Sequence, residues 1–206
     1  MCFLLVRCTE AMRLTTWVLA AYGALGALGA FLAVAFGQSP IMRAPWLEVS
    51  GVEAALASLV LGVCGAALAL ILTRLLFTRA KWARALHDKL RPLVRHEDDA
   101  VIWVMAIASS IGEELFFRGF LSVTIGVVLS SVAFGVLHQV RGAGRFGCAG
   151  SAFVMGLFLS SLYALTGQLV GCVVAHAIVN VVNLQYLRDH DPHPKPRKLG
   201  GLLKQS

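Results

Sequence analysis

Apolar residues along this chain form long runs that short charged segments separate. Four windows contain no Asp, Glu, Lys, Arg or His: residues 14–36, 54–73, 119–137 and 146–175. An α-helix needs about 20 apolar residues to cross the hydrocarbon core of a bilayer. The last window is too long for one crossing, and the turn residues Thr166-Gly167-Gln168 predict that residues 148–187 divide into two helices.

A further crossing is expected over residues 99–118, where the acidic run His96-Glu97-Asp98-Asp99 suits a helix N-terminus. The pattern therefore predicts an all-α fold, a polytopic membrane helix bundle of about six transmembrane helices. The composition agrees, because 58% of the 206 residues are hydrophobic and only 14% are charged. The first apolar run is longer than the core of an ordinary signal peptide, so we expect it to be retained as a span.

The net charge of +7 is unevenly distributed. Basic residues gather in residues 79–95, in residues 141–145 and after residue 188, whereas the opposite side keeps little beyond Arg43. The positive-inside rule then predicts cytoplasmic N- and C-termini, in a bacterial inner (plasma) membrane. These charges are expected to touch anionic lipid headgroups of the bilayer, and no nucleic-acid partner is expected.

Three regions are expected along the chain. Residues 1–99 form an N-terminal two-span region with a basic cytoplasmic loop, which includes a short amphipathic interfacial helix around Trp82 and Leu86. Residues 100–187 form the helical core that carries the polar motifs, and residues 188–206 form a disordered basic tail. The series Gly23, Gly26 and Gly29 predicts close packing of the first helix against a neighbour.

Five ionisable residues fall within the last four predicted spans: Glu113, Glu114, Arg118, His138 and His176. Each costs about 2.5 to 3.5 kcal/mol to insert, so such residues usually face a bundle interior or a wet cavity. Glu114 and Arg118 are four residues apart on one helical face and are expected to pair. Glu113 lies about 100° around the helix and has no obvious local partner.

The two histidines each share a helical face with another residue. Phe134 and His138 are four residues apart, as are His176 and Asn180. If the chain bends near Gly126, His138 reaches the depth of Glu113 and His176, whereas a bend at Gly119 leaves it closer to the cytoplasm. The first arrangement predicts that three helices bring these polar groups together.

The motifs Glu113-Glu114-x-x-x-Arg118, Phe134-x-x-x-His138 and His176-x-x-x-Asn180, in this order, resemble those of the CPBP family of intramembrane proteases, the CAAX prenyl protease 2 and bacteriocin-processing type. The resemblance covers about residues 100–187. It implies an endopeptidase that hydrolyses a peptide bond of a membrane-bound protein or peptide. With only six predicted spans, a sorting tail, leader peptide or signalling protein is a better expected substrate than a prenylated protein.

The resemblance also implies roles for the polar residues. Glu113 would activate water with the help of His138, while His176 and Asn180 would stabilise the oxyanion. Glu114 and Arg118 would keep these side chains in place without contacting the substrate. The cofactor is either none or zinc, because Glu113, His138 and His176 could supply three ligands with water as the fourth; the metal-free glutamate-type enzyme is slightly favoured. Two other functions stay open: a proton- or cation-coupled transporter, and a catalytically silent immunity or scaffold member of the family.

Overall fold

The computed structural model describes residues 2–142 and 144–191, with side chains from residue 15 onward. Within this part the regular structure is helical, and five helices are long and apolar enough to cross a membrane. They are Thr15–Ala35 of α1 (Cys2–Ala35), α2 (Gly51–Arg79), the continuous stretch Asp99–Ile125, α7 (Arg145–Thr166) and α8 (Leu169–Asp189). The predicted fold class, a polytopic helical membrane bundle, is confirmed.

The third of these helices has three parts. It begins as α4 (Asp99–Glu114), continues as the π-helical segment η1 (Leu115–Leu121) and ends as α5 (Ser122–Ile125). The chain then turns at Gly126, whose φ of +89° is readily accessible to glycine. Of the two bends considered from the sequence, this is the one that brings His138 to the depth of the other polar groups.

The sixth expected crossing differs from the prediction, which placed it over residues 119–137. Its first residues extend the third helix, so only α6 (Val127–Leu137) remains, with 11 residues. At 1.5 Å per residue it is about 16 Å long, roughly half the thickness of the hydrocarbon core. α6 therefore ends just before His138, part-way along the bundle.

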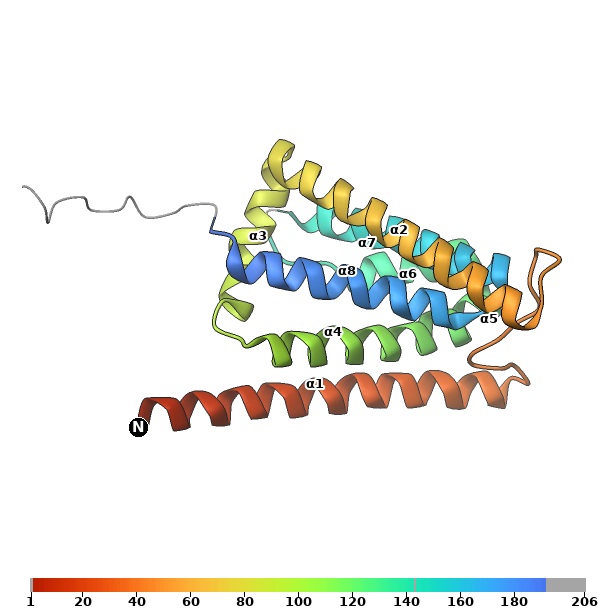
Figure 1. Cartoon of the computed structure of the whole chain (residues 1–206), viewed down its shortest axis with the longest axis horizontal. Coiled ribbons are helices and arrows are strands. Elements are labelled where there is room, and N and C mark those ends of the chain that lie inside the picture. The colour runs from red at the N-terminus through yellow and green to blue at the C-terminus, as the bar shows by residue number, and fades with distance from the viewer. Residues whose placement is uncertain (1, 143, 192–206) are drawn as a thin grey trace, which may run out of the picture.

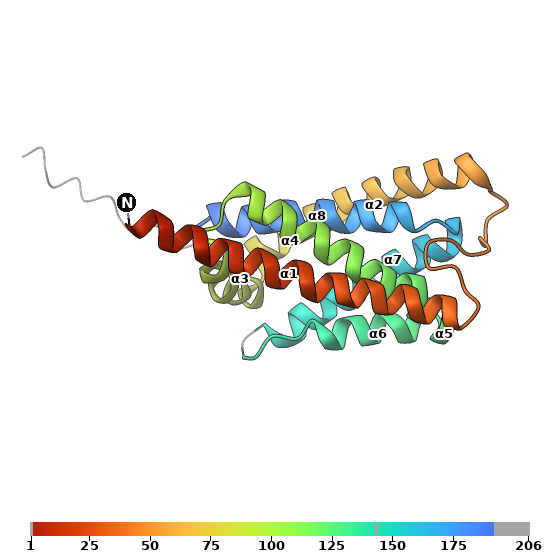
Figure 2. The ribbon, with the colours of Figure 1, turned by 90° about the horizontal axis from the view of Figure 1, so that it is seen from below.

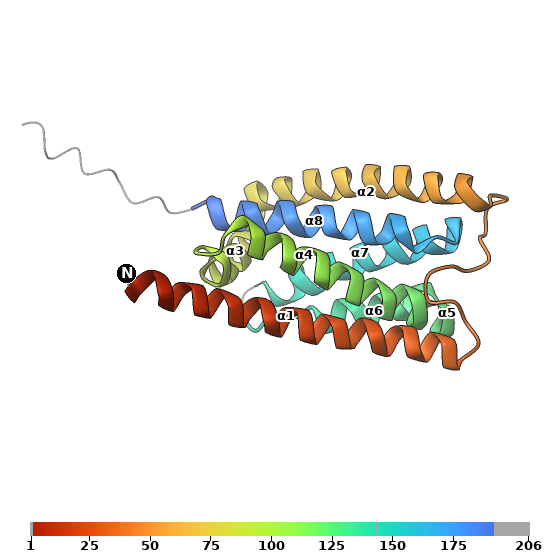
Figure 3. The ribbon, with the colours of Figure 1, turned by 60° about the horizontal axis from the view of Figure 1, so that its bottom comes forward.

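The long helices lie side by side, with α1 along one edge and α2 along the other (Figures 1 and 3). The N-terminus and the end of α8 lie at one end of the bundle, and the α1–α2 connection lies at the opposite end. The predicted short helix is α3 (Lys81–Val94), which runs across the bundle at the end that holds the N-terminus. The basic segments around residues 79–95, 141–145 and 188 thus share one end.

The loop between α1 and α2 closes the other end of the bundle. The Arg43 amide donates to the Gly167 carbonyl over 3.0 Å, and the Trp46 amide donates to the Ala164 carbonyl over 2.9 Å. Gly167 has a φ of +69°, and a Cβ there would lie 2.3 Å from the Arg43 carbonyl oxygen. The turn expected at residues 166–168 is therefore present, and a glycine is needed within it.

Helix α1 packs tightly on α4 and η1 (Figure 2). Gly26 and Gly29 face this contact, and a Cβ on Gly29 would lie 2.5 Å from the Cα of Phe116. Gly23, the third member of the predicted glycine series, faces open space instead. Two of the three glycines thus support the close helix packing that the sequence predicted.

Large apolar side chains cover the outside of the bundle, as lipid contact requires. Trp17 and Val52 are each 74% exposed, whereas the buried residues of α2 are all small: Ala54, Ser58, Gly62 and Ala66. Small buried and large exposed side chains are the pattern of helices that pack against one another within lipid. With the five long apolar helices, this pattern identifies an integral membrane protein.

The end of α8 is anchored where a disordered tail was expected to begin. The helix continues to Asp189, and Arg188 contacts Asp99 at the start of α4 with Nη1 and Oδ1 2.7 Å apart. Residues 192–206 of the expected tail lie outside the described residues.

Candidate active site

Glu114 and Arg118 form a fully buried ion pair at the junction of α4 and η1. Arg118 Nη1 lies 2.8 Å from Glu114 Oε1, and both side chains are 0% exposed. Arg118 Nη2 also donates to the Gly156 carbonyl of α7 over 3.4 Å. Its guanidinium lies 4.5 Å from the centre of the Phe134 ring, within range of a cation–π interaction. The pair that the spacing predicted therefore forms, and it joins the third helix to α6 and α7.

Glu114 also orients His176. His176 Nδ1 lies 2.7 Å from Glu114 Oε1, the same oxygen that Arg118 contacts. Because that oxygen already accepts from a guanidinium, Nδ1 carries the proton and donates it. Nε2 of His176 then points away from Glu114 and towards Glu113.

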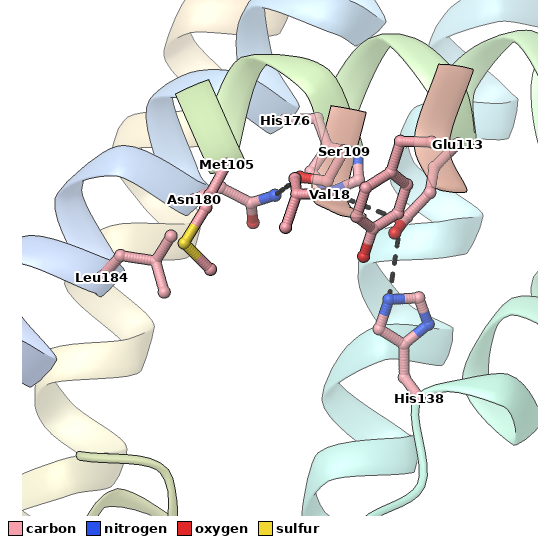
Figure 4. A pocket seen from close by; sticks show the side chains of 9 residues that line it. Val18, Met105, Ser109, Glu113, His138, His176, Asn180 and Leu184 are labelled. Carbon is pink, nitrogen blue, oxygen red and sulfur yellow. Dashed lines mark hydrogen bonds and ion pairs between the residues drawn. The ribbon is translucent and has the colours of Figure 1, made fainter. Parts of the chain in front are cut away.

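Glu113 meets both histidines at a single carboxylate oxygen. Its Oε2 lies 3.5 Å from His138 Nε2 and 3.8 Å from His176 Nε2. Glu113 comes from α4, His138 from the end of α6, and His176 from α8, so three helices converge here (Figure 4). The residue without a local partner in the sequence finds its partners across the bundle.

His138 is oriented by its own helix. His138 Nδ1 lies 2.8 Å from the Phe134 carbonyl oxygen at the C-terminus of α6, so Nδ1–H donates to it. This leaves Nε2 facing Glu113. A water cannot fit on the 3.5 Å line between the two side chains, but one at about 2.8 Å from each can bind both from the cavity side.

Asn180 joins the same face of α8, one turn after His176. Its Nδ2 donates to Ser109 Oγ over 3.2 Å. A side-chain amide carries two N–H groups, so this contact orients the amide and leaves one donor available. The structure thus places all six polar residues singled out from the sequence in one cluster.

A cavity of about 270 Å³ borders this cluster. Its lining combines Glu113, His138, His176 and Asn180 with side chains that the sequence did not single out: Val18, Tyr22, Met105, Ser109 and Leu184. Val18, Met105 and Leu184 extend the lining towards the end of the bundle that holds the N-terminus, because each lies on that side of the polar residue in its helix. Figure 4 shows the polar side chains pointing into the cavity. The side chain of His138 is 35% exposed, against 9% for Glu113 and 6% for His176.

The sequence offers a usable signal for one of the polar residues in this lining and none for the other. Ser109 lies one helical turn before Glu113, and this spacing was a usable signal. Tyr22 lies in α1, where no polar residue stands three or four positions away, and only the fold brings it to the site.

The charges of the cluster balance only with an added proton. Glu113 and Glu114 carry two negative charges when ionised, against one positive charge on Arg118. A buried unpaired charge is strongly unfavourable. One added proton neutralises the cluster.

A metal site has little support in the arrangement of side chains. Among the described residues, no group of three or more His, Cys, Asp or Glu side chains is arranged to hold a metal ion. The expected zinc ligands Glu113, His138 and His176 are not among such a group, so the metalloprotease alternative gains no support from their geometry.

Residues 99–182 match the family model described as type II CAAX prenyl endopeptidase Rce1-like. Over this range, called the Rce1-like core below, the chain is similar to that family. The match confirms the resemblance to CAAX-type proteases drawn from the motifs, and the Rce1-like core contains all six polar residues. No curated protein and no solved structure matches the chain.

The Rce1-like core runs from the first residue of α4 into α8 and leaves α1, α2 and α3 outside the matched range. At the family level the match supports an intramembrane endopeptidase of the CAAX type. A bilayer and a membrane-associated peptide substrate are the partners that such a protein requires.

Proposed function

We propose that this chain is a glutamate-type intramembrane endopeptidase, in which Glu113 activates a water molecule to hydrolyse a peptide bond of a membrane-bound protein or peptide. One observation carries the proposal: Oε2 of a buried carboxylate lies 3.5 and 3.8 Å from two imidazoles of other helices, beside a cavity. A structural hydrogen-bond network would bring these groups closer and fill the space between them.

In the first step a water bound between Glu113 and His138 is the nucleophile. Glu113 takes a proton from it, and the water oxygen bonds to the carbonyl carbon of the substrate. A carboxylate in hydrogen-bonding reach of a water is a competent general base. His138 directs the water through Nε2, because its Nδ1–H is held by the Phe134 carbonyl.

The carbonyl oxygen of the substrate then gains the electron pair of its π bond. We assign the stabilisation of this oxyanion to His176 and to the free N–H of Asn180, one turn apart on α8. His176 donates from Nε2 when it holds the added proton that neutralises the cluster, because Nδ1–H already donates to Glu114. Glu114 holds His176 through Nδ1, and Ser109 holds Asn180, so both donors are oriented before the substrate binds. Donors fixed in a site with little water stabilise developing negative charge strongly.

In the last step the carbon–nitrogen bond breaks. The proton that Glu113 took from water passes to the leaving nitrogen, giving a carboxylic acid and an amine. Glu113 returns to its starting charge, so the cycle balances without another reactant.

The orientation in the membrane belongs to the same proposal. The N-terminus, α3 and the end of α8 share one end of the bundle (Figure 2). In the described part of the chain, the basic residues of the 79–95 segment and Arg188 belong to this end. The positive-inside rule then supports a cytoplasmic location for this end, in a bacterial inner membrane.

A comparison of protein termini in membranes tests the proposed activity. Cells that carry the wild type and cells that carry Glu113→Gln are compared by quantitative identification of N- and C-termini in the membrane fraction. We expect at least one pair of new termini that depends on Glu113. Glu53→Gln, an exposed glutamate in the first turn of α2, is the matched control and is expected to behave as wild type.

Equal termini in wild-type and Glu113→Gln membranes would contradict the proposal, provided that both proteins insert and unfold alike. A phenotype that persists in Glu113→Gln would instead favour a silent scaffold or immunity role. Proton-coupled uptake by wild-type proteoliposomes would favour a transporter.

A further inference from the structure

One side chain of α1 lies in the site, although α1 is outside the Rce1-like match. Tyr22 is half-buried and lines the same cavity as Glu113. Its hydroxyl is close enough to the Glu113 carboxylate to interact with it.

The position of Tyr22 is fixed by direct backbone contact between helices. A Cβ on Gly112, the residue before Glu113, would lie 2.3 Å from the Tyr22 carbonyl oxygen. One turn further, a Cβ on Gly26 would lie 3.2 Å from the Cα of Gly112. Contacts this close leave α1 little freedom to slide or rotate on α4. The glycines therefore set Tyr22 against Glu113 with a defined register.

Glu113 needs such a neighbour. Its Oε2 has no hydrogen-bond partner among the described residues, and the 3.5 and 3.8 Å separations from the two histidines exceed a normal hydrogen bond. A carboxylate held only by such long contacts can rotate away from the attacking water. A phenol hydroxyl is a neutral donor that can hold a carboxylate without adding charge to the cluster.

We propose that Tyr22 is a positioning residue of this site, whose hydroxyl donates to the Glu113 carboxylate and keeps it turned towards His138 and His176. The inference rests on the proposed role of Glu113 as the base. Its consequence is that the working site extends beyond the Rce1-like core and includes the first membrane helix.

Infrared spectroscopy of the full chain in liposomes tests this contact without any substrate. The carboxylate band of Glu113 is identified by its loss in Glu113→Gln. Tyr22→Phe, which removes only the hydroxyl, is expected to shift this band. Tyr186→Phe, which removes a hydroxyl near the end of α8, is expected to leave it unchanged. An unshifted band in Tyr22→Phe would overturn the proposal.

Kinetics then test the consequence for catalysis. The probe is a synthetic peptide spanning a bond that wild type cleaves and Glu113→Gln does not, presented in proteoliposomes. We expect Tyr22→Phe to lower kcat by roughly tenfold, the worth of one hydrogen bond to a charged group, with KM changed less than about twofold. Wild-type kcat in Tyr22→Phe would overturn the proposal and leave the proposed function standing.

The two failures are distinguishable. If wild type and Glu113→Gln have the same activity, the proposed function fails, and the infrared band still decides whether Tyr22 holds Glu113. If Tyr22→Phe unfolds more readily than wild type, Gly29→Leu supplies a second test. Its side chain meets the η1 backbone and displaces α1 with Tyr22 unchanged. The same band shift in Gly29→Leu is expected, and its absence would count against the proposal.

Discussion

The buried ion pair between Glu114 and Arg118 makes the sharpest prediction about stability. Arg118→Met keeps most of the side-chain volume but leaves the Glu114 carboxylate, 0% exposed, with His176 as its remaining partner. Removing one partner of a buried pair costs about 3 to 5 kcal/mol, because the other charge stays buried. The cation–π contact with Phe134 is lost as well. We therefore expect Arg118→Met to lower the free energy of unfolding by about 3 to 5 kcal/mol.

The double variant Glu114→Gln/Arg118→Met separates stability from catalysis. It leaves no unpaired buried charge, and the amide oxygen still accepts from His176 Nδ1. Replacing a buried pair by neutral groups of similar volume is often close to neutral, so we expect most of the lost stability to return. Activity should stay at least about tenfold below wild type, because an amide favours the charged, donating form of His176 less than a carboxylate does.

Denaturant titration in mixed micelles measures the free energy of unfolding, and terminus analysis or peptide cleavage measures activity. Lys81→Met, which removes an exposed charge at the start of α3, is the control and should change stability by less than about 0.5 kcal/mol. The reasoning is refuted if Arg118→Met unfolds like Lys81→Met, or if the double variant is no more stable than Arg118→Met alone.

Three further predictions concern packing, orientation and pH. Gly112→Ala places a Cβ 2.3 Å from a backbone oxygen of α1 and should cost about 1 to 3 kcal/mol, whereas Gly23→Ala, which faces open space, should be neutral or stabilising in the same denaturant titration. Ser109→Ala removes the acceptor that orients the proposed oxyanion amide; we expect kcat to fall several-fold with KM little changed, and an unchanged kcat would contradict that assignment. Burial lowers the pKa of His87 below its ordinary value of 6.5, so the protonated form is disfavoured in the folded state. The folded protein should therefore lose stability as the pH falls below 6.5. The melting temperature of His87→Gln should depend less on pH across this range than that of wild type, and an equal pH dependence in the two proteins would argue against this reasoning.

Much of the site could be predicted because its members repeat at helical spacing. The four-residue intervals from Glu114 to Arg118 and from His176 to Asn180 follow from the geometry of one helix, and the pair at the first interval forms. The turn at Gly167 followed from a glycine in a break between two apolar runs. These patterns depend only on residues close together in the sequence, so the contacts between helices do not change what they predict.

The parts that escaped prediction depend on contacts between distant segments. The π-helical turn of η1 leaves no clear mark in an apolar sequence. The span expected over residues 119–137 is shorter because its first residues extend the third helix. The contribution of Tyr22 depends on glycines of two helices meeting face to face. The spacing of Gly26 and Gly29 marks a packing face of α1 close to Tyr22, but it does not show that Glu113 lies across that face.

The short α6 has a consequence for the lipids around the protein. A hydrophobic wall of about 16 Å beside neighbours nearly twice as tall forces the local bilayer to thin or headgroups to dip inwards, at a cost of a fraction of a kcal/mol per Å. Solvent then comes nearer to His138 than the thickness of an undisturbed membrane would allow. Water can then reach the depth of His138, where a peptide anchored in the bilayer can meet it without leaving the lipid.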